Sequence, residues 1–159
     1  MRIRAAEPAD LDRLTTLTIE TFRPLFEDHW PKSLGPVVFE HDHGRWQDNY
    51  RVEVPALLDP DHGKYVTVAE SEDGALLGYV GWRVTGDGGR MELVAVAPPW
   101  QRQGVGRAIC QHVLDRMRAM AVTVVHVGTG GDEFHAPARG LYESLGFSGL
   151  PVVDYTQAL

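Results

Sequence analysis

The chain has 159 residues, of which 43% are hydrophobic and 23% charged, and its formal net charge is −7. This length and composition predict one globular domain, residues 1–159, large enough to bury its own core. The negative charge argues against a general nucleic-acid binder, and no apolar run is long enough to span a membrane. A single cysteine, Cys110, excludes a disulfide framework. Together with an N-terminus that lacks an apolar leader, it predicts a protein of the reducing cytoplasm.

The first third of the chain carries alternating strand and helix signals. Residues 1–6 are predicted to form an opening strand, and apolar residues at helical spacing predict a helix that ends before Pro24. Residues 24–44 are interrupted by three prolines and two glycines, so no long regular element is expected there. A second helix is predicted from about residue 45 to residue 58, although Pro55 should bend it or end it early.

The rest of the chain is predicted to form strands, with two helices between them in the sequence. Two alternating segments predict a β-hairpin, and a short apolar strand stopped by two prolines follows it. An amphipathic helix then leads to an apolar, β-branched run that is typical of a central strand. A short helix and one last strand complete the series. In chain order these elements are residues 65–71, 75–84, 91–97, a helix with core positions from Ile109 to Met120, then 122–127, 137–145 and 152–156.

A glycine-containing turn at residues 101–106 separates the strand at 91–97 from the helix that follows. Gly104 and Gly106 allow backbone N–H groups to face outward at the start of the helix. Such a helix end carries unpaired donors and a partial positive charge, which favours an anion. The alternative interpretation is a strand-to-helix turn whose backbone conformation requires glycine and which binds no ligand.

The residues around this turn exclude two common phosphate-binding motifs. A dinucleotide fingerprint needs a third glycine where Ile109 stands, and a Walker-type loop needs lysine followed by Ser or Thr where Arg107 and Ala108 stand. Residues 100–120 nevertheless carry a net charge of +3 in a chain of −7. This local excess favours a polyphosphate ligand.

Two blocks of the sequence resemble the GNAT superfamily of N-acyltransferases. Gln101-x-x-Gly104-x-Gly106, after Val94-x-Val96, resembles the acyl-CoA signature of that family. The segment Ala138-Arg-Gly-Leu-Tyr-Glu-Ser-Leu-Gly-Phe147 resembles its Ala-x-x-Leu-Tyr-x-x-x-Gly-Phe helix. The resemblance is strongest over residues 91–147 and weak over residues 23–62.

The resemblance implies an α/β (α+β) fold with a mixed, mostly antiparallel central sheet of six or seven strands. This sheet would be splayed between the strands at 91–97 and 122–127, and about four helices would flank its two faces. The last strand and its edge would be free to pair across a two-fold axis, which predicts a homodimer.

The resemblance also implies acetyl-CoA as the cosubstrate, with no metal. Freed backbone groups of Val94 and Val96 would pair with the pantetheine arm, and N–H groups from Arg102 to Arg107 would bind the pyrophosphate. A backbone amide near Val96 would polarise the thioester carbonyl. His135 stands where the family often has Asn. The implied cofactor-binding residues are Val94, Ala95, Val96, Gln101, Arg102, Gln103, Gly104, Val105, Gly106, Arg107, His135 and Ala138.

The catalytic residues implied by the resemblance are Tyr142 and Glu92. Tyr142 would be the general acid for the departing thiolate, and Glu92 would take the proton of the amine, with His126 as an alternative base. From the residues alone, Tyr142 is equally a core tyrosine, Glu92 a surface or ion-paired carboxylate and His126 a hydrogen-bonded core histidine.

Six of the fourteen aromatic residues lie within residues 22–50, a segment that also has an excess of acidic residues. In the family this region roofs the acceptor site, so we expect an aromatic, acidic lid suited to an amine, although the same rings would also pack the segment onto the sheet. The predicted substrate-binding residues are Phe26, Trp30, Trp82 and His126. The cluster of His29 with His41, Asp42 and His43 lacks zinc-type spacing, and no metal is predicted.

The sequence therefore predicts an acetyl-CoA-dependent N-acetyltransferase that acts on a primary amine of a small molecule or peptide by direct attack. The alternative is a non-catalytic acyl-CoA-binding or sensing module of the same fold.

Overall fold

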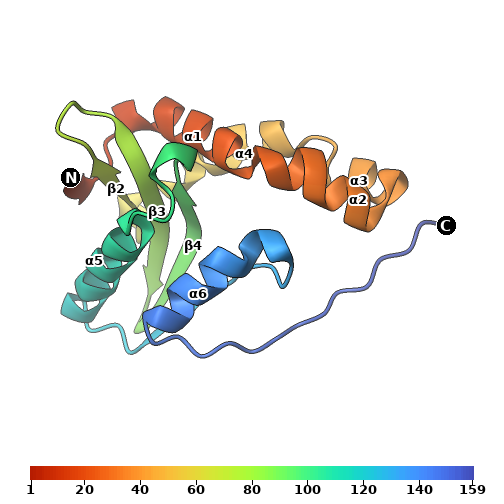
Figure 1. Ribbon diagram of the computed structural model, residues 1–159. Coiled ribbons are helices and arrows are strands. Elements are labelled where there is room, and N and C mark those ends of the chain that lie inside the picture. The colour runs from red at the N-terminus through yellow and green to blue at the C-terminus, as the bar shows by residue number, and fades with distance from the viewer.

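The computed structural model describes residues 1–159 and is built on a five-stranded sheet with helices on both faces (Figure 1). Neighbouring strands are antiparallel except for the last pair, β4 and β5, which is parallel. The strands follow one another across the sheet in chain order: β1 (Arg2–Ala5), β2 (Lys64–Glu70), β3 (Leu76–Thr85), β4 (Gly88–Val96) and β5 (Val124–Val127).

Two helices cover each face of the sheet, and a pair of short helices extends from one of these layers (Figure 1). The layers are α1 (Leu11–Pro24) with α4 (Trp46–Glu53), and α5 (Val105–Ala119) with α6 (Ala136–Ser144). A π-helical turn, Leu25–His29, continues α1 into α2 (Trp30–Leu34) and α3 (Pro36–His43). Short 3-10 turns lie at Pro8–Asp10, Pro55–Leu57, Pro60–His62, Pro98–Trp100 and Glu133–His135.

Strand alternation divides the core into two clusters on opposite faces of the sheet. Adjacent residues of β3 illustrate the division, because Tyr79 packs with Leu14 of α1 while Val80 packs with Ile109 of α5. All four side chains are fully buried. The sheet is therefore a rigid layer that separates the side of α1 from the side of α5.

The parallel pair β4 and β5 separates after four residues. Gly88–Met91 pair with Val124–Val127, whereas β4 continues to Val96 with no partner on that side. The predicted splay between these two strands is thus confirmed.

The predicted count of six or seven strands is wrong, because the sheet has five. Residues 152–156 form no strand: the chain from Ser148 to Leu159 is extended and makes no backbone ladder. The run at 122–127 is also not a central strand, since β5 begins at Val124 and is the edge of the sheet.

Residues 24–44, for which no long regular element was expected, are mostly helical. Pro36 is the first residue of α3, where a missing N–H costs nothing because that donor has no helical partner, and Pro31 is the second residue of α2, which follows directly on the π-helical turn. The predicted helix from residue 45 ends as Pro55 suggested, with α4 followed by a 3-10 turn. None of the helices combines the length and the apolar character that crossing a membrane requires.

Candidate active site

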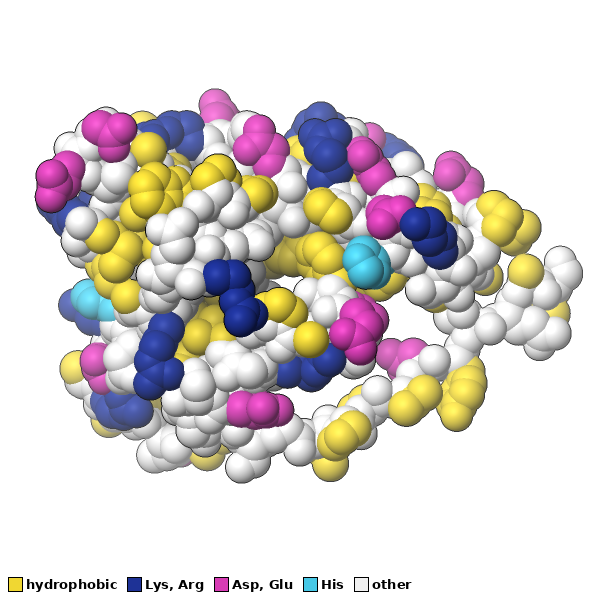
Figure 2. Space-filling view, in the orientation of Figure 1, with side chains coloured by type: hydrophobic (Ala, Val, Ile, Leu, Met, Phe, Trp, Pro, Cys, Tyr) yellow, Lys and Arg dark blue, Asp and Glu magenta, His cyan; other side chains and the backbone are white.

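A cleft of about 190 Å³ lies where the splayed strands, α6 and the α1–α4 layer meet. Figure 2 shows hydrophobic side chains at the bottom of the recess between the upper helical layer and α6. The lining residues fall into four groups along the chain: Phe22, Leu25, Phe26, Trp30 and Tyr50; Met91, Glu92, Leu93 and Val94; Val127, Gly128 and Thr129; and His135, Ala138 and Tyr142.

The backbone of β4 presents free hydrogen-bonding groups to the gap. The N–H of Ala97 donates to the carbonyl of Leu77 at 2.9 Å, so these two residues are a hydrogen-bonded pair across β3 and β4. Antiparallel pairs alternate, which makes the pairs of Val94 and Val96 non-hydrogen-bonded. Their N–H and C=O groups consequently point away from β3, toward the side that β5 has left. The carbonyl of Val96 accepts from the side chains of Gln101 and Thr21, so the free groups are the N–H and C=O of Val94 and the N–H of Val96.

The turn after β4 ends in an unpaired helix N-terminus. The first helical bond of α5 runs from the N–H of Ala108 to the carbonyl of Gly104 at 3.0 Å, and the N–H groups of residues 104–107 donate to no protein group. Gly104 has a φ of 83°, and Arg102 has a φ of 61°. The left-handed conformation of these residues directs the donors of the turn outward.

Side chains of the turn hold it in place rather than point into the gap. The Nε2 amides of Gln101 and Gln103 donate to the carbonyls of Val96 at 3.0 Å and Pro99 at 2.8 Å. The guanidinium of Arg107 donates to the hydroxyl of Ser144 at 2.6 Å and so links the start of α5 to the end of α6.

The remaining predicted cofactor residues surround the turn. Val105 and Ala95 are buried, Ala95 in the cluster on the α1 side of the sheet. A β-carbon on Gly106 would lie 3.4 Å from Val96 and 3.5 Å from Leu141, so this glycine sits close to both β4 and α6.

Tyr142 lies on α6 and is 7% exposed. Its hydroxyl makes no hydrogen bond, and no buried side-chain oxygen or nitrogen in the chain lacks a partner, so this hydroxyl opens to the cleft. Burial, assisted by the nearby Cys110, raises the pKa of Tyr142 above its usual value. The phenol therefore keeps its proton throughout the neutral range.

Glu92 occupies a β-bulge, because Gly81 pairs with Leu93 while Trp82 pairs with Met91. The bulge breaks strand alternation. Val94 shares the α5-side cluster with Met91, while Leu93 packs on the α1 side, so simple alternation, which would place Glu92 on the face of Val94 and Val96, does not hold along β4. The carboxylate of Glu92 lines the cleft, is 25% exposed and forms an ion pair with Arg83 at 3.0 Å.

His135 is oriented by Asp132. The carboxylate of Asp132 accepts from the backbone N–H of His135 at 3.1 Å and lies 2.8 Å from its Nδ1. Burial opposes ionisation of Asp132, but its hydrogen bonds with His135 hold its pKa below the usual value. These contacts leave Nε2 as the ring nitrogen without a protein partner. His135 and Ala138 both line the cleft.

Phe26 and Trp30 line the cleft as predicted substrate-binding residues would, but Trp82 and His126 do not. Trp82 is 3% exposed, and its Nε1 donates to the hydroxyl of Thr67 at 3.0 Å. His126 pairs with Arg90 below the point where β4 and β5 separate. Trp82 and His126 therefore lie outside this cleft, and the structure does not bring them together with Phe26 and Trp30.

Several cleft residues were not predicted. Phe22 and Tyr50 stack at 5.7 Å beside Phe26, and only their membership of the aromatic segment hinted at the cleft. Asp132 precedes His135 by three residues, a spacing that allows a capping contact across one turn. The four histidine and aspartate residues around Asp42 form no metal-binding group; His43 instead packs against Trp30 at 4.3 Å.

A split sheet with free strand groups, next to an unpaired helix N-terminus and a buried phenol, defines a class of protein that binds an extended amide chain with a phosphate head. The family model of the acetyltransferase (GNAT) family matches residues 15–147. The chain belongs to this family.

Curated relatives agree with this assignment. The [ribosomal protein bS18]-alanine N-acetyltransferase of Escherichia coli K12 is 31% identical over 85 residues, which cover 54% of this chain and 56% of the relative. The mycothiol acetyltransferase of Nocardiopsis dassonvillei is 33% identical over 105 residues, 60% of this chain and 30% of the relative. The chain thus covers only about half the length of the first of these relatives.

Solved structures share the fold. A Bacillus halodurans protein superposes with a TM-score of 0.72 and 17% identity over the full length of both chains. The PaiA N-acetyltransferase of Thermoplasma acidophilum, solved with coenzyme A, has a TM-score of 0.69 and 12% identity, covering 92% of this chain and 89% of that one.

Proposed function

We propose that this chain is an acetyl-CoA-dependent N-acetyltransferase that acts on a primary amine of a small molecule or peptide. The observation that carries the proposal is the presence of two neighbouring sets of unused backbone groups: the N–H and C=O of Val94 with the N–H of Val96 on β4, and the N–H groups of residues 104–107 at the N-terminus of α5. Pantetheine contains amides that fit a strand edge, and a pyrophosphate fits a helix N-terminus. Relatives solved with coenzyme A or acetyl-CoA support the same ligand.

The residues that would hold the cosubstrate divide into three groups. Val94, Ala95 and Val96 would supply the strand, and residues 102–107 would supply the N–H donors for the phosphates. His135 and Ala138 flank the cleft from the side of α6. The N–H of Val96 points into the gap and is suited to polarise the thioester carbonyl.

In the transfer step, the amine nitrogen forms a bond to the thioester carbon, and the carbon–sulfur bond breaks. Tyr142 supplies a hydrogen bond and then a proton to the departing sulfur, because its phenol is protonated and opens to the cleft. Glu92, or water held by it, accepts the proton that the amine loses. The aromatic walls formed by Phe26 and Trp30 would exclude water around the acceptor.

The chemistry of the acceptor follows from the relatives only in outline. Named relatives acetylate an alanine of a ribosomal protein or bear the name mycothiol acetyltransferase, and one neighbour is an aminoglycoside acetyltransferase solved with sisomicin. We propose a small-molecule or peptide amine for this chain as well. We further propose that residues 1–159 act as one domain, in the cytoplasm, and as a homodimer.

The test is release of free coenzyme A from acetyl-CoA in the presence of a panel of peptides, amino acids, polyamines and aminoglycosides. We expect at least one amine to be acetylated, with the product identified by a mass increase of one acetyl group. Binding of acetyl-CoA without turnover across the panel would instead indicate a non-catalytic acyl-CoA-binding module.

A further inference from the structure

The cleft contains very little charge. Eleven of its fifteen lining residues are hydrophobic, and neither lysine nor arginine is among them. Glu92 is its one carboxylate, and this group already forms an ion pair with Arg83 at 3.0 Å. His135 adds no net positive charge, because the carboxylate of Asp132 lies 2.8 Å from its Nδ1. A carboxylate on the ligand would therefore find no free cation in the cleft, and several ammonium groups would share one anion.

The lid, residues 22–50, contributes rings to the cleft but no acidic side chain. None of its five acidic residues lines the cleft: Glu27, Asp28, Glu40, Asp42 and Asp48. Three of the five pair with a neighbouring Arg or Lys, as Glu27 does with Arg23 at 3.2 Å and Asp48 with Arg51 at 2.7 Å. The acidic charge expected of the lid thus lies in solvent, and its contribution to the cleft is apolar.

Four rings of the lid form one wall of the cleft. Phe26 is 7% exposed and stacks on Trp46, which fixes its position. Phe22, Trp30 and Tyr50 are only half-buried, so they keep aromatic surface for a ligand. Aromatic rings pair favourably at centroid distances of about 4.5–7 Å, offset or edge-on. The wall is therefore suited to a ring on the ligand.

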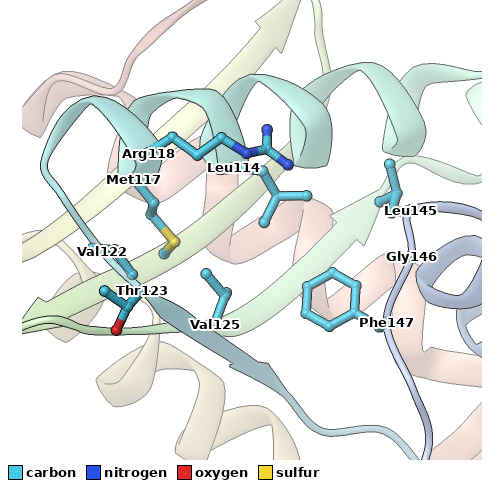
Figure 3. Close-up of a pocket in the computed structure, with 9 residues that line it drawn as sticks. All are labelled: Leu114, Met117, Arg118, Val122, Thr123, Val125, Leu145, Gly146 and Phe147. Atoms are coloured by element: carbon cyan, nitrogen blue, oxygen red, sulfur yellow. The ribbon is translucent and has the colours of Figure 1, made fainter.

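A larger hollow, of about 320 Å³, is a poor alternative site for an amine (Figure 3). It lies between α5 and β5, where Leu114 points toward Val125 and Phe147. Arg118 is its one charged residue, and a guanidinium repels an ammonium group. The hollow also contains none of the proposed catalytic residues. An amine is better suited to the cleft.

The volume of the cleft limits the size of the acceptor. About 190 Å³ is less than the roughly 300–1,000 Å³ of pockets that enclose drug-sized ligands. The thioester end of the cosubstrate would occupy part of this space. The remainder suits one ring on a short chain better than several linked rings.

We propose that the acceptor is a primary monoamine joined to an aromatic ring by a short chain, with no carboxylate and no second charged amine. This inference rests on the proposed function and names the class of amine. Phe22, Trp30 and Tyr50 hold the ring, and Glu92 receives the amine. A free arylalkylamine and a peptide that begins with an aromatic residue share this chemistry.

A matched series of amines tests the proposal. 2-Phenylethylamine, phenylalaninamide and phenylalanine share one ring and one primary amine, and only phenylalanine carries a carboxylate. We expect kcat/KM for the first two to exceed that for phenylalanine, butylamine and spermidine by about fivefold or more. A smaller advantage over any of these three overturns the proposal. A peptide amide that begins with phenylalanine identifies the source, since its acceptance indicates peptide N-termini and its rejection indicates free amines.

Trp30→Leu tests the placement of the ring, because leucine keeps an apolar wall without aromatic surface. The preference for 2-phenylethylamine over butylamine should fall by about threefold or more. Phe39→Leu is the matched control, since it removes a ring that packs against the same cluster outside the cleft, and the preference should not change. A preference that survives in Trp30→Leu, or falls equally in both variants, overturns the placement.

Binding distinguishes failure of this inference from failure of the proposed function. Calorimetric titration of each amine into the chain, with and without coenzyme A, involves no acetyl transfer. Tighter binding of 2-phenylethylamine without acetylation of any amine would contradict the proposed function and leave the ligand class standing. Acetylation without a preference for the aromatic amines would do the reverse.

Discussion

Burial determines what Tyr142 contributes to the site. Desolvation keeps its phenol protonated, and the ring is fixed among α5, α6 and Phe147, which lies 6.0 Å away in an edge-on arrangement. Because its pKa is raised, this phenol gives up its proton less readily than an exposed tyrosine does. In the proposed mechanism it would face the departing thiolate, for which a fixed hydrogen-bond donor is the most useful neighbour.

Tyr142→Phe therefore removes the donor while leaving the packing nearly intact. We expect kcat to fall about 100-fold or more, with little change in the KM for acetyl-CoA. Steady-state kinetics measures both constants. The control is Tyr65→Phe, because Tyr65 stacks on Trp82 away from the cleft. An unchanged kcat in Tyr142→Phe would remove the residue from the acid role.

Gly104 is the residue on which the anion site depends most. It has a φ of 83°, and a β-carbon at this position would have nothing within 4 Å, so an added methyl group meets solvent or the ligand, never the protein. Gly74 has the same φ and the same open surroundings in the hairpin between β2 and β3. Gly74 is therefore a matched control for the proposed ligand contact at Gly104, since both glycines carry the same φ and neither has a protein atom in the way.

Gly104→Ala and Gly74→Ala should each lose about 1–2 kcal/mol of unfolding free energy from left-handed strain. Only Gly104→Ala should weaken coenzyme A binding, by roughly tenfold, which corresponds to about 1.4 kcal/mol. Calorimetric titration compares the two variants. Equal affinities would mean that the phosphates bind elsewhere.

At the scale of elements, the lid is an aromatic cluster attached to α1 by the π-helical turn. Phe26 stacks on Trp46 at 4.7 Å with nearly parallel planes and meets Trp30 edge-on at 4.9 Å. Trp30 lines the cleft, whereas Phe39 packs against the same cluster outside it. The lid therefore forms one wall of the cleft, on the side where the proposed acceptor would bind.

Trp30→Ala should raise the KM for the amine several-fold and leave coenzyme A affinity unchanged, because only the acceptor wall is lost. Phe39→Leu is the control for loosening of the cluster, and it should alter neither constant. Kinetics with the amine identified by the panel gives both values. A parallel loss of coenzyme A affinity in Trp30→Ala would show that the lid also holds the cosubstrate.

The junction of β1, β2 and α1 depends on a charged network that is sensitive to acid. Arg4 contacts the carboxylates of Asp10 at 2.7 Å and Glu70 at 3.0 Å, and hydrogen bonding with Arg4 lowers the pKa of Asp10. Because the folded-state pKa lies below the unfolded value of about 3.9, this stabilisation is complete above that pH and lost as the pH falls through the folded pKa.

Asp10→Asn should therefore lower the unfolding free energy at pH 7 by about 3 kcal/mol and flatten its acid dependence. Urea unfolding from pH 7 downward measures this difference, which should shrink below about pH 4. Asp12→Asn, on the exposed start of α1, should change the unfolding free energy little. A constant difference across the pH range would exclude the titration of Asp10 as its cause.

The sequence predicted those elements that are marked by residues within the element itself. Gly104, Gly106 and the flanking prolines indicated the turn, and the four-residue contact between β4 and β5 agrees with the predicted splay. The bulge at Glu92 escaped prediction because nothing in an alternating run marks an extra residue. Pro31 and Pro36 were interpreted as breakers, although proline also begins helices. The alternation at 152–156 shows a strand's pattern but does not specify its partner.

At the scale of the whole molecule, the split in the sheet joins two halves of a site. In the proposed function, the turn at 101–107 and α6 would form the half for the cosubstrate, and the aromatic cluster at α1, α2 and α4 would form the half for the amine. Tyr142, Glu92 and the free edge of β4 lie where the two halves meet. The sheet keeps these parts fixed, while variation in the lid would change the acceptor without disturbing the cosubstrate.

Calorimetric titration of the wild-type chain with acetyl-CoA tests the proposed cosubstrate site most directly. We expect saturable binding of one acetyl-CoA per chain, with a dissociation constant below about 1 mM, the upper end of usual substrate affinities. Absence of binding at millimolar acetyl-CoA would contradict the assignment of the split sheet and the N-terminus of α5 to this ligand.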